Sequence, residues 1–260
     1  MTGEAHQPAS PPLQWLARPE TSALLFLAAA AWAATLVIAR GMTTMAGTMG
    51  FDIGAFVAVW TLMMAAMMLP SVAPLASLYA RSVTSNRAMR VSSLIAGYLL
   101  VWAAAGVPAY GLAWLTSWLD THHSAVAHGA AVAIFAACGG YQLTSFKDRC
   151  LAHCRSPCGL LLRYGSFRGR TRDLRVGLHH GGYCLGRCWA LMAILIAVGV
   201  MNLVAMVALA VLILAEKVSP RGEVIARLAG LAALGLAIAT IWLPWLAPGL
   251  QAAHPMMMSS

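Results

Sequence analysis

Long apolar runs separated by short islands of charge constrain this chain more than any other feature of its sequence. Each run is long enough to cross a bilayer as a helix. Hydrophobic residues make up 60% of the chain and charged residues only 10%, whereas soluble domains carry roughly a quarter charged residues. We therefore predict an all-α, polytopic integral membrane bundle of about six transmembrane helices. The predicted spans are Ser22–Ala39, Phe51–Leu69, Val91–Leu119, Ala125–Leu143, one long run from Tyr183 to Lys217, and Glu223–Leu246.

The charged islands predict how the chain is organised and oriented. Residues 1–21 form an N-terminal flexible segment, residues 22–247 the transmembrane domain with a Cys/His/Arg-rich loop over 144–182, and residues 248–260 a C-terminal tail. The 81–90 segment and the 144–182 loop are rich in arginine, so the positive-inside rule places them and the N-terminus in the cytoplasm. The orientation of the last hairpin stays open. Because the net charge of +9 lies beside apolar spans, it favours a lipid bilayer over nucleic acid as the partner.

The stretch from Lys147 to Met192 holds five of the six cysteines and three of the eight histidines. A tetrahedral soft-metal site needs four such ligands, and cytoplasmic thiols stay reduced, so the clustering favours metal binding over disulfides. At Tyr183 the start of a helix would favour the thiolates that metals need. Any single cysteine could still be a small packing residue. The candidate ligands are Cys150, His153, Cys154, Cys158, His179, His180, Cys184 and Cys188.

Methionines provide a second group of soft ligands. One set recurs at helical spacing after the first span, and another forms two i, i+4 pairs in the second span. Thioethers suit Cu(I), although they also fill irregular gaps in apolar cores. The sequence thus predicts copper as the metal, with zinc as the alternative. The methionine candidates are Met42, Met45, Met49, Met63, Met64, Met67 and Met68.

Other polar residues have structural interpretations. Asp52 is expected to cap the second helix, and Asn202 to hydrogen-bond across a helix interface inside the fifth span. His122 and His123 could bind Cu(II) or Zn(II), but adjacent side chains on a helix point apart, which favours a solvated loop. Cys138 is predicted to be a packing residue away from the cysteine cluster.

Three segments resemble one protein family. WTLMMAAMMLPSVAP, YQLTSFKDRCLAHCRSP and GGYCLGRCWALM with its following apolar run look like the DUF2182 family, bacterial integral membrane proteins described as predicted metal-binding. The resemblance covers residues 46–217 and implies a bacterial inner membrane location. It also implies metal binding through Cys150, His153, Cys154, Cys158, Cys184 and Cys188. Many members of the family have a further Cys where this chain has Arg187.

Three functions fit these patterns. The first is a copper-handling membrane protein that binds the ion with its Cys/His cluster and Met-rich helix faces. The second is a membrane thiol-disulfide oxidoreductase that uses Cys150 with Cys154 and Cys184 with Cys188. The third is a non-catalytic anchoring or assembly subunit with a protein partner in a membrane complex. The sequence has no Ser/His/Asp set, phosphate loop, HExxH helix or paired intramembrane carboxylates, so it does not support a hydrolase, an ATP-driven pump or a proton-coupled carrier.

Overall fold

The computed structural model describes residues 18–42, 47–155, 164–165 and 167–250, and it is all-helical in these ranges. Six helices are long and apolar enough to cross a membrane, which confirms the predicted class and number of spans. They are α1 (Pro19–Arg40), α2 (Ile53–Ser82), α3 (Arg87–His122), α4 (Ser124–Gln142), α7 (Arg172–Val198) and α9 (Gly222–Trp242). Two shorter helices are α5 (Ser145–Arg155) and α8 (Leu203–Val218), and the 3₁₀ turns Pro244–Leu246 and Pro248–Leu250 follow α9.

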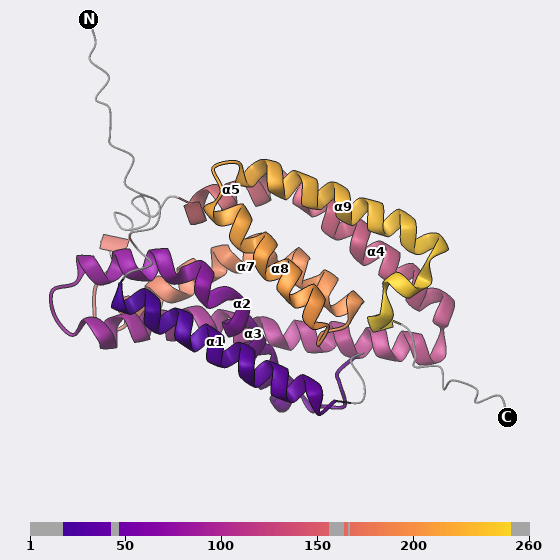
Figure 1. Cartoon of the computed structure of the whole chain (residues 1–260), viewed down its shortest axis with the longest axis horizontal. Helices are drawn as coiled ribbons and strands as arrows, with labels where there is room; N and C mark the ends of the chain where they lie inside the picture. The colour runs from indigo at the N-terminus through magenta and orange to yellow at the C-terminus, as the bar shows by residue number, and fades with distance from the viewer. Residues whose placement is uncertain (1–17, 43–46, 156–163, 166, 251–260) are drawn as a thin grey trace, which may run out of the picture.

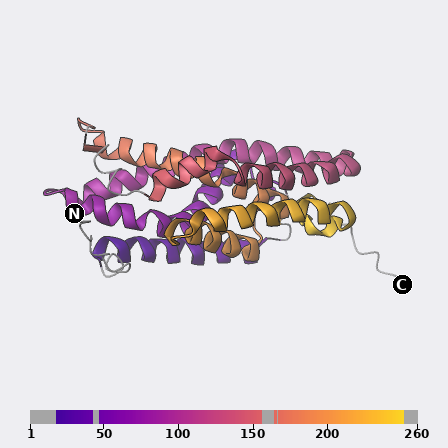
Figure 2. The ribbon, with the colours of Figure 1, turned by 90° about the horizontal axis from the view of Figure 1, so that it is seen from above.

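The helices form an elongated bundle whose long axis follows the membrane-spanning segments (Figure 1). Seen from above, α1 and α9 lie along one side and α3 and α4 along the other (Figure 2). The most extensive packing joins α3 to α7, α1 to α2, and α4 to α9. Helix α2 runs through the core, since nearly every side chain from Met63 to Ala80 is buried.

The long apolar run after Tyr183 is not one span, as the sequence predicted, but two antiparallel helices. Helix α7 begins earlier, at Arg172, and ends at Val198; Gly199 follows it with a φ of 107°, which suits a residue without a side chain. Asn202 then caps α8, accepting a hydrogen bond at 3.1 Å from the amide of Ala205. The expected hydrogen bond from Asn202 across a helix interface is therefore replaced by a local cap. Hydropathy missed the break because the turn is itself buried and apolar.

Local capping and proline residues shape α2. Asp52 accepts hydrogen bonds from the amides of Gly54 at 2.8 Å and Ala55 at 3.0 Å, which confirms the predicted cap. Pro70 and Pro74 lie inside the helix, where they disturb its backbone hydrogen bonding. The Lys217 ammonium of α8 donates to the carbonyl of Ser71 between the two prolines. In this way α8 is fixed to the proline-containing turn of α2.

Glycines allow α3 and α7 to cross in backbone contact. A Cβ on Gly97 would lie 2.3 Å from the carbonyl oxygen of Leu174, and one on Gly177 would lie 1.9 Å from that of Leu94. Real side chains do not fit at such distances, so glycine is required at both positions. Close approach through small residues is the usual way in which helices associate in lipid. This crossing sets the distance between α3 and the first turns of α7.

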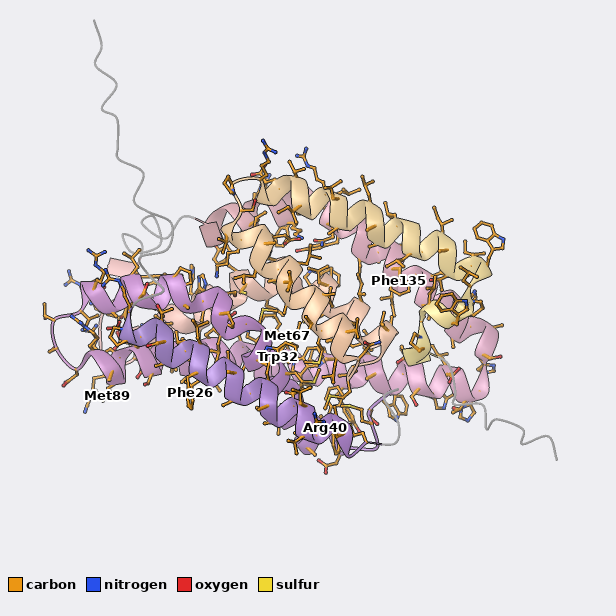
Figure 3. The ribbon with its side chains drawn as sticks, viewed as in Figure 1. Phe26, Trp32, Arg40, Met67, Met89 and Phe135 are labelled. Carbon is orange, nitrogen blue, oxygen red and sulfur yellow. The ribbon has the colours of Figure 1, made fainter. Side chains whose placement is uncertain are left out.

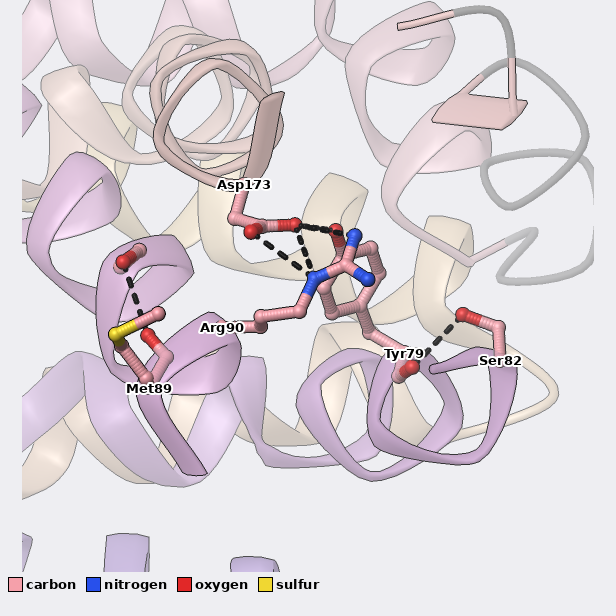
Figure 4. A network of polar contacts seen from close by, with 6 residues as sticks. Tyr79, Ser82, Met89, Arg90 and Asp173 are labelled. Atoms are coloured by element: carbon pink, nitrogen blue, oxygen red, sulfur yellow. Dashed lines mark hydrogen bonds and ion pairs between the residues drawn. The ribbon is translucent and has the colours of Figure 1, made fainter. Parts of the chain in front are cut away.

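A polar network holds the first turn of α7 to α2 and α3 (Figure 4). The Arg90 guanidinium contacts both carboxylate oxygens of Asp173, at 3.0 to 3.1 Å, and the Tyr79 hydroxyl donates to the same carboxylate. Arg90 and Asp173 are partly buried and Tyr79 is fully buried. Asp173 lies where the helix macrodipole favours a negative charge. The network therefore fixes the start of the helix that carries Cys184 and Cys188.

Candidate metal centre

Cys184 and Cys188 lie one turn apart in the middle of α7, and both are fully buried. The Tyr98 hydroxyl of α3 is 3.1 Å from the Cys184 sulfur, and the two thiols are within hydrogen-bonding reach of each other. Because α7 begins at Arg172, its N-terminus is several turns away. The dipole of the first turn, which the sequence suggested would stabilise thiolates here, therefore does not act on these residues.

Arg187 supplies the positive charge beside these thiols. Its guanidinium is fully buried, 3.5 Å from the Cys188 sulfur and 3.4 Å from the carbonyl oxygen of Ile213 on α8. Its charge also acts on Cys150 and Cys184. A buried guanidinium beside a sulfur favours the thiolate over the thiol. Arg187 thus places a buried cation beside the cysteines of α7.

Cys150 approaches the same turn of α7 from α5. Lys147, Cys150 and Leu151 form the buried face of this short amphipathic helix. A Cβ on Gly186 would be 3.4 Å from the Cys150 sulfur, so this thiol packs directly over the backbone between Cys184 and Cys188. Burial raises the pKa of the Cys150 thiol, and the nearby Arg187 charge acts in the opposite direction. Thiols from two helices therefore meet at one level of the bundle.

A buried ion pair flanks this level and was not found from the sequence. The Lys147 ammonium lies 2.9 Å from the Glu216 carboxylate of α8 and also donates to the side chain of Gln142 on α4, and all three residues are fully buried. Burial lowers the pKa of Lys147, while the Glu216 charge opposes that shift. The only hint in the sequence is that each charge lies at the end of an apolar run.

The two adjacent histidines of α7 have different surroundings. His180 is fully buried, and its ring centroid lies 6.0 Å from that of Tyr98, the residue that contacts Cys184. His179 contacts aromatic rings instead, with its Nδ1 3.3 Å from the Tyr164 hydroxyl and its ring centroid 5.0 Å from that of Tyr183. Of the two predicted ligands, His180 therefore lies on the side of α7 that carries Cys184, and His179 lies in an aromatic cluster.

The remaining candidates of the cysteine cluster are described only in part. His153 and Cys154 belong to α5, but their side chains are outside the described residues, and Cys158 lies entirely outside them. Among the side chains that are described, no group of three or more His, Cys, Asp and Glu residues is arranged to hold a metal ion. The described thiols and His180 thus form only part of the predicted ligand set.

The methionines of α2 are buried at the depth of the thiols. Met63, Met64, Met67 and Met68 are at most 3% exposed, and Figure 3 shows Met67 among the helices at the centre of the bundle. The Trp60 indole donates to the carbonyl of Trp102 at 3.2 Å, which fixes how α2 and α3 are aligned. Because these helices are antiparallel, the next turn of α2 lies level with Tyr98.

The methionines between α1 and α2 lie at the end of the bundle where these two helices are connected, away from the level of the thiols. Met42 is partly buried at the end of α1, and Met49 is buried before α2, whereas Met45 lies outside the described residues. Their connection packs on α3, since a Cβ on Gly47 would meet the Ser117 side chain at 2.7 Å. The helical and loop methionines are therefore two separate groups.

Cys138 is closer to the cluster than the sequence suggested. It is buried, as predicted for a packing residue, but its thiol donates a 2.8 Å hydrogen bond to the carbonyl of Ala190 on α7. Ala190 is two residues after Cys188 on α7, so this hydrogen bond places Cys138 of α4 close to the level of Cys188. This proximity depends on packing between helices and has no signal in local spacing.

Comparison with known proteins identifies one family. A family model described as "PpoB2: Copper chaperone" matches residues 57–240, well over half of the chain. DUF2182 is the former name of this family. The matched segment contains α3 to α8 and therefore every cysteine of the chain. No curated protein and no solved structure matches the chain.

Proposed function

The chain belongs to the PpoB2 copper chaperone family, and from this premise we propose that it carries Cu(I) on buried thiols contributed by α5 and α7. The observation that carries the proposal is the packing of Cys150 over Gly186, level with Cys184 and Cys188. His153, Cys154, Cys158, His179 and His180 complete the set from which further ligands are drawn.

The chemistry of this donor set favours Cu(I) over Zn(II). Thiolates are soft ligands, and structural zinc sites are closed by four of them or by thiolates with imidazoles. Cu(I) prefers the softest ligands, so it suits a site built on the paired thiols of Cys184 and Cys188 with Cys150 packed over Gly186. Cu(I) with two thiolates has a net charge of −1, and the buried Arg187 guanidinium 3.5 Å from Cys188 offsets that charge.

The methionines extend this proposal along α2. Met63, Met64, Met67 and Met68 lie at the depth of Tyr98 and Cys184, in an apolar core that excludes water. Thioethers bind Cu(I) without losing a proton, so they can hold the ion more weakly than thiolates do. We assign them the role of a transient path between the two ends of the bundle.

The distribution of charge supports an orientation for the protein in a bacterial inner membrane. Arg81, Arg87 and Arg90 lie around the turn between α2 and α3, and the start of α7 is also rich in arginine. At the end of the bundle where α1 meets α2, the described basic side chain is Arg40 (Figure 3). By the positive-inside rule the arginine-rich end faces the cytoplasm.

Competition for Cu(I) tests the proposal. Purified full-length protein in detergent is titrated against a chromogenic Cu(I) chelator, together with a Cys184→Ser/Cys188→Ser variant and a Cys150→Ser variant. The double variant should lose roughly a hundredfold or more in affinity, because second-shell changes alone cost about 10–100-fold. Unchanged Cu(I) affinity in the double variant would overturn the proposal.

Two further variants make the test specific. Cys138→Ser is the matched control, because serine can keep the hydrogen bond to Ala190 while removing a buried thiol. Met64→Leu/Met68→Leu should leave the tight site intact and slow the loading of copper. If Cys184 and Cys188 instead form a reversible disulfide under mild oxidant, measured by alkylation and mass spectrometry, a thiol-disulfide oxidoreductase becomes the better interpretation.

A further inference from the structure

The junction between α3 and α4 carries two exposed histidines. His122 is the last residue of α3, and His123 lies outside helical conformation, with φ −147° and ψ 68°, before α4 begins at Ser124. On an uninterrupted helix the two imidazoles would point about 100° apart. The break in the helix at His123 removes that constraint.

Both imidazoles pack on the same indole. The His122 ring stacks on Trp118, with centroids 4.8 Å apart and planes 21° apart. The His123 ring meets the same indole edge-on, at 5.9 Å and 63°. Stacking restricts rotation of the His122 ring, and the edge contact places the His123 ring beside the same indole.

The hydrogen bonds of His122 leave its outer nitrogen able to bind a ligand. Nδ1 is 2.9 Å from the carbonyl oxygen of Trp118 and 2.8 Å from the Thr121 hydroxyl, which itself donates to that carbonyl. A carbonyl oxygen can only accept, and the hydroxyl oxygen can accept as well, so a proton on Nδ1 satisfies both contacts. The lone pair is therefore on Nε2. Metal-binding histidines commonly have this arrangement, in which one nitrogen donates to a backbone carbonyl and the other binds the ion.

We propose that His122 and His123 form a second metal site, for Cu(II), at the end of the bundle opposite the thiols. Imidazole suits divalent copper, which binds nitrogen ligands more tightly than the other first-row divalent ions. Among the described side chains no third His, Cys, Asp or Glu completes the site, so water fills the other positions. The 19 residues of α4 separate this site from the thiols by about 28 Å.

The neighbouring connection between α1 and α2 adds sulfur to this end of the molecule. Gly47 packs against Ala113 and Ser117 of α3, beside the turn that carries Trp118. Met42 and Met49 precede and follow Gly47 in the sequence. Copper bound by the histidines would thus lie at the same end as thioethers that prefer its reduced form.

Footprinting of the full-length protein tests this site directly. Carbethoxylation of each histidine by diethyl pyrocarbonate is followed by mass spectrometry, with and without Cu(II) sulfate. At a free Cu(II) concentration about ten times the dissociation constant, modification of His122 and His123 should slow about tenfold. His128, in the second turn of α4, is the internal control and should react at an unchanged rate.

Variants decide whether the two histidines act together. In His122→Ala, His123 should lose its protection, whereas in His128→Ala both residues should keep it. Both changes are near the helix junction, and equal melting temperatures would show that the variants are folded. Protection of His123 in the absence of His122, or equal protection of His128, would overturn the proposal. The Cys184→Ser/Cys188→Ser variant should show the same protection of His122 and His123 as the wild type. The histidine site can therefore fail its test while the thiol site passes, and the reverse.

Discussion

Replacement of Gly177 by alanine should push α3 and α7 apart about two helical turns before Cys184. The added Cβ would lie 1.9 Å from the carbonyl oxygen of Leu94, and Cβ atoms essentially never come closer than 3.0 Å to such an atom. The difference, 3.0 minus 1.9, requires about 1.1 Å of separation between backbones. The nearest atoms all belong to the backbone of Leu94 and Tyr98 and not to a flexible side chain, so the helices themselves must move.

That movement would reach Cys184. The Tyr98 hydroxyl lies 3.1 Å from the Cys184 sulfur, and a further separation of about 1.1 Å would take this distance beyond hydrogen-bonding range. Overpacking typically costs about 1–3 kcal/mol, which corresponds to a fall in melting temperature of roughly 2–12 °C. We expect Gly177→Ala to show this loss together with weaker Cu(I) binding.

A maleimide dye that fluoresces on reaction with thiols reports the unfolding in detergent, because Cys184 and Cys188 are fully buried until the bundle opens. Gly182→Ala is the matched control: it lies on the same helix and its added Cβ would have nothing within 4 Å. Alanine also favours helix over glycine, so this control should melt at or slightly above the wild-type temperature. Equal melting of the two variants would refute the close-contact argument.

Three further predictions concern the charged groups. Glu216→Gln should lower the free energy of unfolding by about 3–5 kcal/mol, because it leaves the buried Lys147 ammonium without its carboxylate; chemical denaturation measures this, and Lys147→Met/Glu216→Leu should restore most of the loss. Burial lowers the pKa of Lys147 below 10.5. Between the lowered pKa and 10.5 the unfolded chain therefore binds more protons than the folded protein, and the free energy of unfolding should rise with pH in that range. Melting curves of Lys147→Met that show the same rise would contradict this. Asp173→Asn should cost about 1–3 kcal/mol through its contacts with Arg90 and Tyr79, measured by thermal melting, and no loss would show that the network does not hold α7.

Hydropathy was sufficient to predict the membrane class and the number of spans, because lipid requires long apolar helices. It failed where the chain reverses inside an apolar region. Gly199 and Asn202 held the signal for that turn, namely a glycine in the left-handed region of φ followed by a capping amide. The apolar residues on both sides concealed it, because a buried turn has the same average hydropathy as a helix.

The candidate site was only partly accessible from sequence. Spacing identified Cys184 and Cys188 as a pair, and clustering associated Cys150 with them, but the identity of ligands remains a prediction. The ion pair between Lys147 and Glu216 joins residues 69 positions apart, so no local pattern could predict it. The contact of both His122 and His123 with Trp118 likewise depends on where α3 ends, to within a single residue.

The ion pair between Lys147 and Glu216 also has a consequence for biosynthesis. Helix α8 has only 16 residues, about 24 Å of helix, which is shorter than the roughly 30 Å hydrocarbon core. Its Glu216 emerges from the ribosome long after Lys147, so the carboxylate enters the bilayer at a time when its partner has already been made. Lys147 is therefore available to pair with Glu216 when α8 is made, and we expect the insertion of this short helix to depend on α5, which precedes it.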